Sequence, residues 1–340
     1  MTTPDRAPLD ACPTQGSTHR LRTRAVSRVT SGVVAAVVVA ATLGACGAGA
    51  RPASDGSEPV RGSCPVDPVP VVVSVGQWSD VVNAVGGGCV SVTTVVGSLS
   101  GDPHEFEPRP SDLVAFDRAR IAVLNGNGYD DWARSAVDVT HPDEVVEAAV
   151  AARRLRRDGD GDGLRHDPHL WYSPDVVVAV SDEVADALAR SIPAARSQIR
   201  RDRARWLRAL AAYERELDHA RSALRGRTYV ATEPLFDAAA QALGLRDLTP
   251  PGVRRAAANG SEPSPGDLTE LEDLMRGGAV DVLIVSSQSE GAMPDHIRGL
   301  ARRDDVPVVS IRESQPDGIG FLAWQRRQLR QLIDALERRA

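Results

Sequence analysis

Short apolar runs alternate with longer stretches of helical periodicity over most of the chain. The runs are rich in Val, Ile and Leu and are continuous, without alternation of apolar and polar positions. Continuous apolar runs are typical of strands buried on both faces of a parallel sheet. The predicted strands are 69–75, 90–96, 121–125 and a weaker one near 145–146, followed by 228–232, 243–249, 281–286 and 306–311. The predicted helices of the second half are 235–243, 267–277, 294–303 and 320–338.

Between these two halves lies a segment, 194–224, that contains neither Gly nor Pro. Apolar residues recur in it at intervals of seven, in two stripes: Ile199, Trp206, Tyr213 and Ala220, and Leu210, Leu217 and Leu224. This spacing predicts one helix about 45 Å long with a narrow buried seam. A free coiled coil is the alternative, but the flanking α/β patterns favour a helix that connects two lobes.

The predicted fold class is therefore α/β. It consists of two lobes, each with a small parallel sheet flanked by helices, joined by one long rigid α-helix. A length of 340 residues suits about two domains.

The N-terminus has the pattern of an export signal. Four arginines, at 20, 22, 24 and 28, precede an apolar stretch, 33–43, that is too short to span a bilayer stably. The stretch ends in Leu43-Gly44-Ala45-Cys46, which resembles a bacterial lipobox, in which the cysteine becomes the lipidated first residue. A plain signal peptide with a coincidental cysteine, or an uncleaved anchor, is the alternative.

The expected organisation follows from these segments. We expect a signal peptide at 1–45, a lipidated flexible tether at 46–63, an N-terminal lobe at 64–192, a linking helix at 193–225 and a C-terminal lobe at 226–340. The tether is assigned because 47–63 is rich in Gly, Ala, Pro and Ser and lacks periodicity.

Composition narrows the class of protein. With 42% hydrophobic and 25% charged residues, the chain has enough apolar material for a core, which excludes a disordered protein. The formal net charge of −6 argues against non-specific binding of nucleic acid.

The four cysteines, at 12, 46, 64 and 89, all lie in the first 89 residues of the chain. Cys12 would leave with the signal and Cys46 would be acylated, so that Cys64 and Cys89 remain. An exported, oxidising location favours a disulfide between these two, and free thiols that bind a metal are the alternative.

Residues with metal-ligand chemistry follow the predicted strands. His104 belongs to Asp102-Pro103-His104, after the second strand, and His169 belongs to a second tripeptide, Asp167-Pro168-His169, before a predicted helix. Glu233 follows the strand 228–232, and Glu313 follows the strand 306–311. Because ligands bind outside the carboxyl ends of parallel strands, two imidazoles and two carboxylates would meet there and form a divalent-metal site.

The chain resembles a known family on these motifs, from about residue 69 to 336. The most specific stretches are 102–108, 110–113, Asn125-Gly126 and 167–171, and 262–264 and 306–309 support them. They are similar to the metal-specific solute-binding lipoproteins of bacterial ABC importers, the zinc- and manganese-binding cluster with a helical spine.

The resemblance implies a ligand set and a partner. His104 and His169 would be the histidine ligands, Glu233 the third ligand and Glu313 the fourth, with Asp317 and Glu290 as substitutes for Glu313. The partner would be the permease of an ABC importer, and the protein would act as a membrane-anchored monomer on the extracytoplasmic face.

The cargo would be Zn²⁺ or Mn²⁺. Histidine suits zinc, whereas carboxylates shift the preference toward manganese. The segment 158–163 begins like an EF-hand calcium loop, but its twelfth position is His169 instead of Glu, which disfavours calcium. The resemblance instead suggests that residues 158–166 form a loop that captures metal.

Two other functions compete with metal transport. One is a surface adhesin, and the other is a metallohydrolase that uses the same site. His-Glu-x-x-His and Gly-x-Ser-x-Gly motifs are absent from the sequence, which argues against the enzyme.

Overall fold

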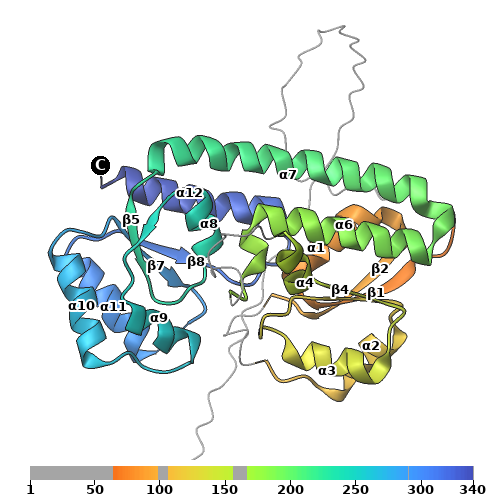
Figure 1. Ribbon diagram of the computed structural model, residues 1–340, viewed down its shortest axis with the longest axis horizontal. Helices are drawn as coiled ribbons and strands as arrows, with labels where there is room; N and C mark the ends of the chain where they lie inside the picture. The colour runs from red at the N-terminus through yellow and green to blue at the C-terminus, as the bar shows by residue number, and fades with distance from the viewer. Residues whose placement is uncertain (1–63, 99–105, 156–166, 290, 340) are drawn as a thin grey trace, which may run out of the picture. The chain divides into compact units, whose positions relative to one another are not determined.

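Two parallel sheets of four strands each form the framework of the protein (Figure 1). The computed structural model describes residues 64–98, 106–155, 167–289 and 291–339. The first sheet has the order β2-β1-β3-β4 and the second has the order β6-β5-β7-β8. The strands are β1 (Val69–Val75), β2 (Val90–Val96), β3 (Ile121–Leu124), β4 (Glu144–Glu147), β5 (Thr228–Ala231), β6 (Arg246–Asp247), β7 (Val282–Ser286) and β8 (Val308–Ile311). We call each sheet with its covering helices the first and the second lobe.

Helices connect the strands and cover both faces of each sheet. In the first lobe they are η1 (Gly76–Trp78), α1 (Ser79–Gly86), η2 (Gly87–Cys89), α2 (Pro110–Arg118), α3 (Asp131–Thr140), α4 (Ala148–Arg154), η4 (Leu170–Tyr172), α6 (Pro174–Ser191) and η5 (Pro193–Ala195). The long helix α7 (Arg196–Leu224) follows, and then come α8 (Asp237–Ala242), α9 (Pro251–Ala258), α10 (Pro265–Arg276), α11 (Ala292–Arg303) and α12 (Phe321–Glu337). The predicted fold class is confirmed.

Burial along the strands follows their position in the sheet. The central strands β1, β3, β5 and β7 are almost completely buried, as the continuous apolar runs predict. The edge strands β2, β4, β6 and β8 each contain exposed or half-buried residues, because only one side of an edge strand pairs with a neighbour.

The predicted strand 243–249 is wrong in extent. Only Arg246 and Asp247 pair with β5, whereas Leu243 and Gly244 end helix α8. Gly244 has a φ of +72°, the left-handed conformation that commonly ends a helix. The sequence reading also missed α9, which begins at Pro251, since proline is favoured in the first turn of a helix.

The two faces of each sheet belong to different hydrophobic clusters. In β1, Val71 and Val73 join the main core, whereas Val72 joins a separate cluster beneath α2 and α3. In β7, Ile284 joins the same main core, and Leu283 joins a cluster with α10 and α11. The inner faces of both sheets therefore share one continuous core.

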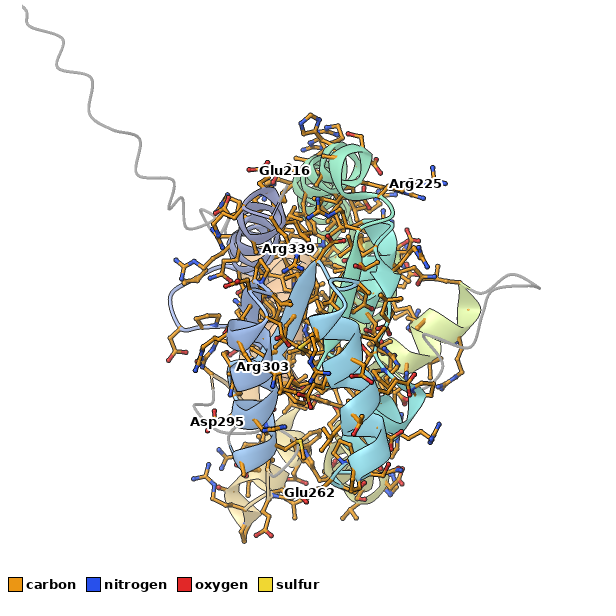
Figure 2. The ribbon with its side chains drawn as sticks, turned by 90° about the vertical axis from the view of Figure 1, so that its left-hand side faces the viewer. Glu216, Arg225, Glu262, Asp295, Arg303 and Arg339 are labelled. Carbon is orange, nitrogen blue, oxygen red and sulfur yellow. A yellow bond between two sulfur atoms is a disulfide. The ribbon has the colours of Figure 1, made fainter. Side chains whose placement is uncertain are left out.

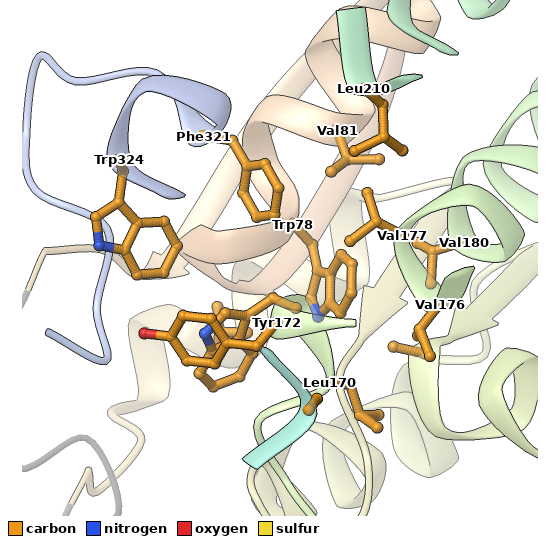
Figure 3. Close-up of a cluster of buried hydrophobic side chains, with 14 of the residues drawn as sticks. Trp78, Val81, Leu170, Tyr172, Val176, Val177, Val180, Leu210, Phe321 and Trp324 are labelled. Atoms are coloured by element: carbon orange, nitrogen blue, oxygen red, sulfur yellow. The ribbon is translucent and has the colours of Figure 1, made fainter. Parts of the chain in front are cut away.

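Helix α7 forms the centre of this shared core. It contacts α1 and α6 of the first lobe and α8 and α12 of the second. All seven residues of the two predicted stripes are buried, so the predicted seam is confirmed. Figure 3 shows Trp78, Val177 of α6, Leu210 of α7 and Phe321 of α12 in one cluster. With 29 residues, α7 is about 44 Å long and continues from one lobe to the other.

At the protein surface, an ion pair also connects α7 to α12. Arg326 donates hydrogen bonds of 2.8 and 2.9 Å to the carboxylate of Glu216, which is labelled in Figure 2. Because both side chains are partly exposed, this pair contributes only about 0.2–1 kcal/mol. The buried seam is therefore the main connection between the two helices. In the described part of the chain, none of the helices is both long and apolar enough to cross a membrane.

A disulfide joins Cys64 to Cys89, as predicted. Cys89 is completely buried in the main core at the start of β2, and Cys64 packs against the same core. The bond therefore holds the first described residue beside the edge strand of the first sheet.

Removing the disulfide should lower stability. The chain-entropy model gives a loss of about 3–4 kcal/mol in the free energy of unfolding for a loop of 25 residues. We expect the Cys64→Ser, Cys89→Ser double variant to unfold at lower temperature and lower denaturant concentration than the wild type. Reducing agent should lower the unfolding temperature of the wild type only. An unchanged unfolding temperature of the reduced wild type would contradict a stabilising role.

Candidate metal centre

The candidate site residues lie at the carboxyl ends of the strands. In both sheets the first and third strands are the central pair, so the connections that leave them go to opposite sides. Such a point is where open parallel sheets bind ligands. In the second lobe, Glu233 follows β5 and Glu313 follows β8. In the first lobe, Asn125 follows β3, and His169 directly precedes η4.

His169 is buried, with a relative exposure of 2%, and both of its ring nitrogens have partners. Nδ1 lies 3.0 Å from Oδ1 of Asp167 and 3.1 Å from the carbonyl oxygen of Pro234. Nε2 lies 2.9 Å from Oε1 of Glu313. A carbonyl and an ionised carboxylate can only accept, so Nδ1 carries a hydrogen and Nε2 is the nitrogen directed at Glu313. A histidine held through Nδ1 in this way is the usual arrangement of a metal ligand.

The charge of His169 depends on these neighbours. Burial alone lowers the pKa of the imidazole, but the hydrogen bonds to Asp167 and Glu313, and their negative charges, raise it to about 10. In the metal-free protein a proton on Nε2 therefore balances the buried carboxylate of Glu313. A metal ion that binds Nε2 has to replace this proton.

Asn125 orients the loop that carries His169. Its Nδ2 donates to the carbonyl of Pro168 at 2.8 Å, and its Oδ1 accepts from Trp78 Nε1 at 3.0 Å. Asp130 in turn accepts from the backbone N–H groups of Asn125 and Gly126, both at 2.7 Å. The buried Asn125 side chain thus fixes the His169 loop relative to the end of β3.

The backbone conformation after Asn125 explains why a glycine follows it. The φ of Gly126, +79°, is the left-handed conformation that favours glycine. A Cβ atom there would lie 2.5 Å from Oε1 of Glu147 and 2.7 Å from Cβ of Ala149. A larger residue would therefore displace the loop that holds Pro168.

Glu313 is 1% exposed, and side chains of both lobes hold its loop. Gln77 of the first lobe donates to the Glu313 carbonyl at 3.0 Å, and Tyr172 donates to the Arg312 carbonyl at 2.8 Å. Asp80 of α1 accepts from the backbone N–H of Phe321 at 2.7 Å, at the start of α12. The His169–Glu313 contact thus lies within a network of contacts between the lobes.

The residue that follows Glu233 in the sequence contacts the His169–Glu313 pair. Pro234, which contacts His169, directly follows Glu233. Oε1 of Glu233 accepts a hydrogen bond of 2.6 Å from Ser289 Oγ. Three of the four predicted ligands therefore belong to segments that meet at one place.

The other predicted positions are either exposed or outside the described residues. His104, Cys46, Glu290 and the loop 158–166 lie outside them. Asp317 is exposed, and Glu313, not Asp317, contacts His169. Within 64–98, 106–155, 167–289 and 291–339, no three His, Cys, Asp or Glu side chains form a group with metal-binding geometry.

Aromatic rings surround His169. Tyr129 and Trp171 contact its ring edge to face, with centroids 6.3 and 5.5 Å away. Burial, together with the charge of Glu313, holds the pKa of Tyr129 well above its usual value, so its hydroxyl stays neutral. These rings keep water from His169, which strengthens the electrostatic interactions there.

Several residues that position the site carry no signal in the sequence. The tripeptide Asp167-Pro168-His169 predicts a ligand at His169 but no role for Asp167, which lies at Nδ1. The motif Asn125-Gly126 likewise predicts no role for Asn125. Gln288 holds the loop of Glu313 and Ser289 contacts the Glu233 carboxylate, and neither belongs to a recognisable sequence pattern. Their roles depend on contacts between segments that are far apart in the chain.

The sequence of the chain matches a known family. The model of the ZnuA family, zinc-uptake complex component A, periplasmic, matches residues 71–335. The chain belongs to this family.

Two curated relatives support the assignment. The manganese-binding lipoprotein MntA of Halalkalibacterium halodurans is 30% identical over 157 residues, which are 46% of this chain and 48% of that protein. The zinc-binding lipoprotein AdcA of Streptococcus pneumoniae is 21% identical over 264 residues, covering 73% of this chain and 52% of that protein. The chain spans about half the length of these relatives.

Solved structures share the fold. The solute-binding protein FpvC of Pseudomonas aeruginosa, solved with Mn²⁺, is 18% identical with a TM-score of 0.66, covering 81% of this chain and all of that chain. A mutant of the laminin-binding adhesin Lmb of Streptococcus agalactiae is 22% identical with a TM-score of 0.65, covering 79% of this chain and 99% of that chain. At these identities the likeness concerns the fold alone.

The raised pKa of His169 predicts how stability depends on pH. A folded-state pKa of about 10, above the unfolded value of about 6.5, means that the protonated imidazole stabilises the metal-free fold. This contribution is complete below about pH 6.5 and is lost as the pH rises through about 10. Denaturant unfolding of metal-free protein between these pH values should show the loss in the wild type and a smaller loss in His169→Gln. An imidazole that titrates near pH 6.5 by NMR would contradict the prediction.

Proposed function

We propose that the chain is an extracytoplasmic solute-binding protein that captures Zn²⁺ or Mn²⁺ between its two lobes and delivers it to an ABC importer. The proposed ligands are His104, His169, Glu233 and Glu313. The observation that carries the proposal is the buried His169–Glu313 contact at the strand ends, in a chain of the ZnuA family.

The chemistry of His169 supports the proposal. Its Nδ1 is held by Asp167 and Pro234, which leaves Nε2 directed at the carboxylate of Glu313. The proton on Nε2 can be exchanged for a divalent cation without leaving a buried negative charge unpaired. In a site of this kind, the metal takes the place of the proton that Nε2 of His169 carries in the metal-free protein.

The donor types limit the cargo to a small class. Imidazole nitrogen suits zinc, and carboxylate oxygen suits the harder manganese ion. The matched relatives are named for manganese and for zinc, which supports a divalent transition metal of this class. Because zinc lies above manganese in the general affinity order, we expect tighter binding of Zn²⁺.

The organisation of the whole chain is part of the proposal. Residues 1–45 would be a signal peptide and 46–63 a tether lipidated at Cys46. The lobes would be 64–192 and 226–340, with 193–225 as the linking helix. The names of the relatives, which are lipoproteins, support an anchor on the extracytoplasmic face of the membrane. The partner would be the importer's permease, and the protein would act as a monomer. The adhesin alternative is supported by likeness of fold alone.

Removal of a ligand should abolish tight metal binding. Protein purified without a histidine tag should bind one Zn²⁺ or Mn²⁺, measured by competition with a chelator of known affinity. A four-ligand zinc site contributes about 10–16 kcal/mol, or roughly 2.5–4 kcal/mol for each ligand, so loss of one side chain corresponds to roughly 100- to 1,000-fold weaker binding. We expect this loss in His169→Ala and in Glu313→Gln.

The controls change the same residue types elsewhere. His219 is exposed on α7 and Glu337 is exposed at the end of α12, so His219→Ala and Glu337→Gln should bind as the wild type does. Glu233→His should shift the preference further toward zinc. Wild-type protein that binds neither metal would refute the proposed function.

Lipidation can be tested separately from metal binding. In cells of a bacterium with lipoprotein processing, the wild type should appear in the membrane fraction and gain the mass of acyl chains. Cys46→Ser should lose both properties, because the acyl chains are attached to the cysteine. Equal membrane recovery of the two proteins would exclude Cys46 as the anchor.

A further inference from the structure

A short turn after β7 contacts the loops of both carboxylates of the second lobe. This β7 turn consists of residues 286–289, and Ser286 and Gln288 are 1% and 3% exposed. Ser286 Oγ accepts from the backbone N–H groups of Gln288 at 3.1 Å and Ser289 at 3.3 Å. The hydroxyl therefore fixes the conformation from which the next two side chains extend.

Gln288 holds the loop that carries Glu313. Its Oε1 accepts from the backbone N–H groups of Glu313 at 2.9 Å and Ser314 at 2.8 Å, and its Nε2 donates to Ser314 Oγ at 3.1 Å. One buried amide thus satisfies three polar groups on the other loop. These contacts act on the backbone, so they place the Glu313 side chain without contacting its carboxylate.

Ser289 acts on a carboxylate directly. Its Oγ donates a hydrogen bond of 2.6 Å to Oε1 of Glu233. Both side chains are half-buried, which limits the access of water to this bond. A hydrogen bond from a hydroxyl to a charged oxygen is short and strong. It therefore withdraws electron density from Oε1 of Glu233 and makes this oxygen a weaker metal ligand.

We propose that Ser289 is a specificity-determining residue that restricts Glu233 to binding the metal through one oxygen and so favours zinc over manganese. Gln288 is a positioning residue that places Glu313 for either metal. The inference rests on the proposed function, because it concerns the same site.

The coordination preferences of the two metals give the physical reason. Zinc sites in proteins are mostly four-coordinate, and a carboxylate that binds through one oxygen fits this number. Manganese suits a larger set of oxygen ligands, up to octahedral. A Glu233 that binds through both oxygens would add one oxygen ligand, and the hydrogen bond from Ser289 opposes this.

The decisive variants lie within the β7 turn. Ser289→Ala removes the hydroxyl, Ser289→Thr retains it, and Ser287→Ala removes an exposed hydroxyl from the same turn as the matched control. The dissociation constants of Zn²⁺ and Mn²⁺ are measured for each by chelator competition. Loss of a hydrogen bond to a metal ligand typically weakens binding about 10- to 100-fold.

We expect Ser289→Ala to weaken zinc binding about 10-fold and manganese binding less, so that the ratio of the two constants shifts toward manganese. Ser289→Thr and Ser287→Ala should keep the wild-type ratio. Gln288→Met should weaken the binding of both metals by a similar factor, because it displaces the backbone of Glu313 and frees no oxygen of Glu233.

The absorption spectrum of bound Co²⁺ reports the coordination number of the metal, which a change in protein stability alone would not alter. Co²⁺ in a four-coordinate site absorbs strongly in the visible range, and higher coordination weakens the absorption. The wild type and Ser289→Thr should show the strong spectrum, and Ser289→Ala a weaker one.

The outcomes separate this inference from the proposed function. Wild-type protein that binds neither metal would refute both. If the wild type binds metal and Ser289→Ala keeps its zinc-to-manganese ratio and its cobalt spectrum, the inference is wrong and the proposed function stands. If Ser289→Ala fails to fold, Ser289→Cys replaces it, because a thiol is a much weaker donor, and the same two readings decide.

Discussion

The buried seam of α7 is the constraint on which the site depends. The inner faces of both sheets, together with α1, α6 and α12, contribute to one continuous core around this helix. Sliding one lobe against the other would break a close-packed interior, which tolerates few voids. The carboxyl ends of β3 and β8 are therefore held at a fixed separation. That separation allows Nε2 of His169 and Oε1 of Glu313 to approach to 2.9 Å.

This contact is costly by itself, because it removes a carboxylate and an imidazolium from water. Such buried pairs often contribute little net stability, and they persist where they serve a specific arrangement. Here Asp167, Gln77 and Gln288 surround the pair with fixed hydrogen bonds, so the geometry exists before any cation arrives. In the proposed function, such a preformed site would lose little conformational entropy when it binds a metal. Its affinity would depend on pH, because the metal must displace the proton on Nε2.

Much of the framework could be predicted because it depends on local patterns. The seven-residue spacing predicted the buried residues of α7, since the period of an α-helix is set by its backbone geometry. The elements that were misread are short ones at the edge of the second sheet. The strand β6 has only two residues, and both are exposed. Because neither packs into the core, the strand has no apolar run that would reveal it in the sequence. For the candidate site, the His169 tripeptide and Glu313 were recognisable from their place after or before a predicted element. Asp317 could not be distinguished from Glu313 until burial separated them.

The sequence by itself determined the class of the fold, the long helix, the disulfide pair and the residue types offered to a metal. These follow from hydrophobic periodicity, from the number and positions of the cysteines in a chain with the pattern of an export signal, and from donor chemistry, all of which are properties of the sequence. Only the tertiary structure decided which nitrogen of His169 faces Glu313, and that Gln288 holds the Glu313 loop while Ser289 contacts the Glu233 carboxylate. Those choices depend on hydrogen bonds between segments up to 144 residues apart, and distances of that kind are set by how the lobes pack on α7.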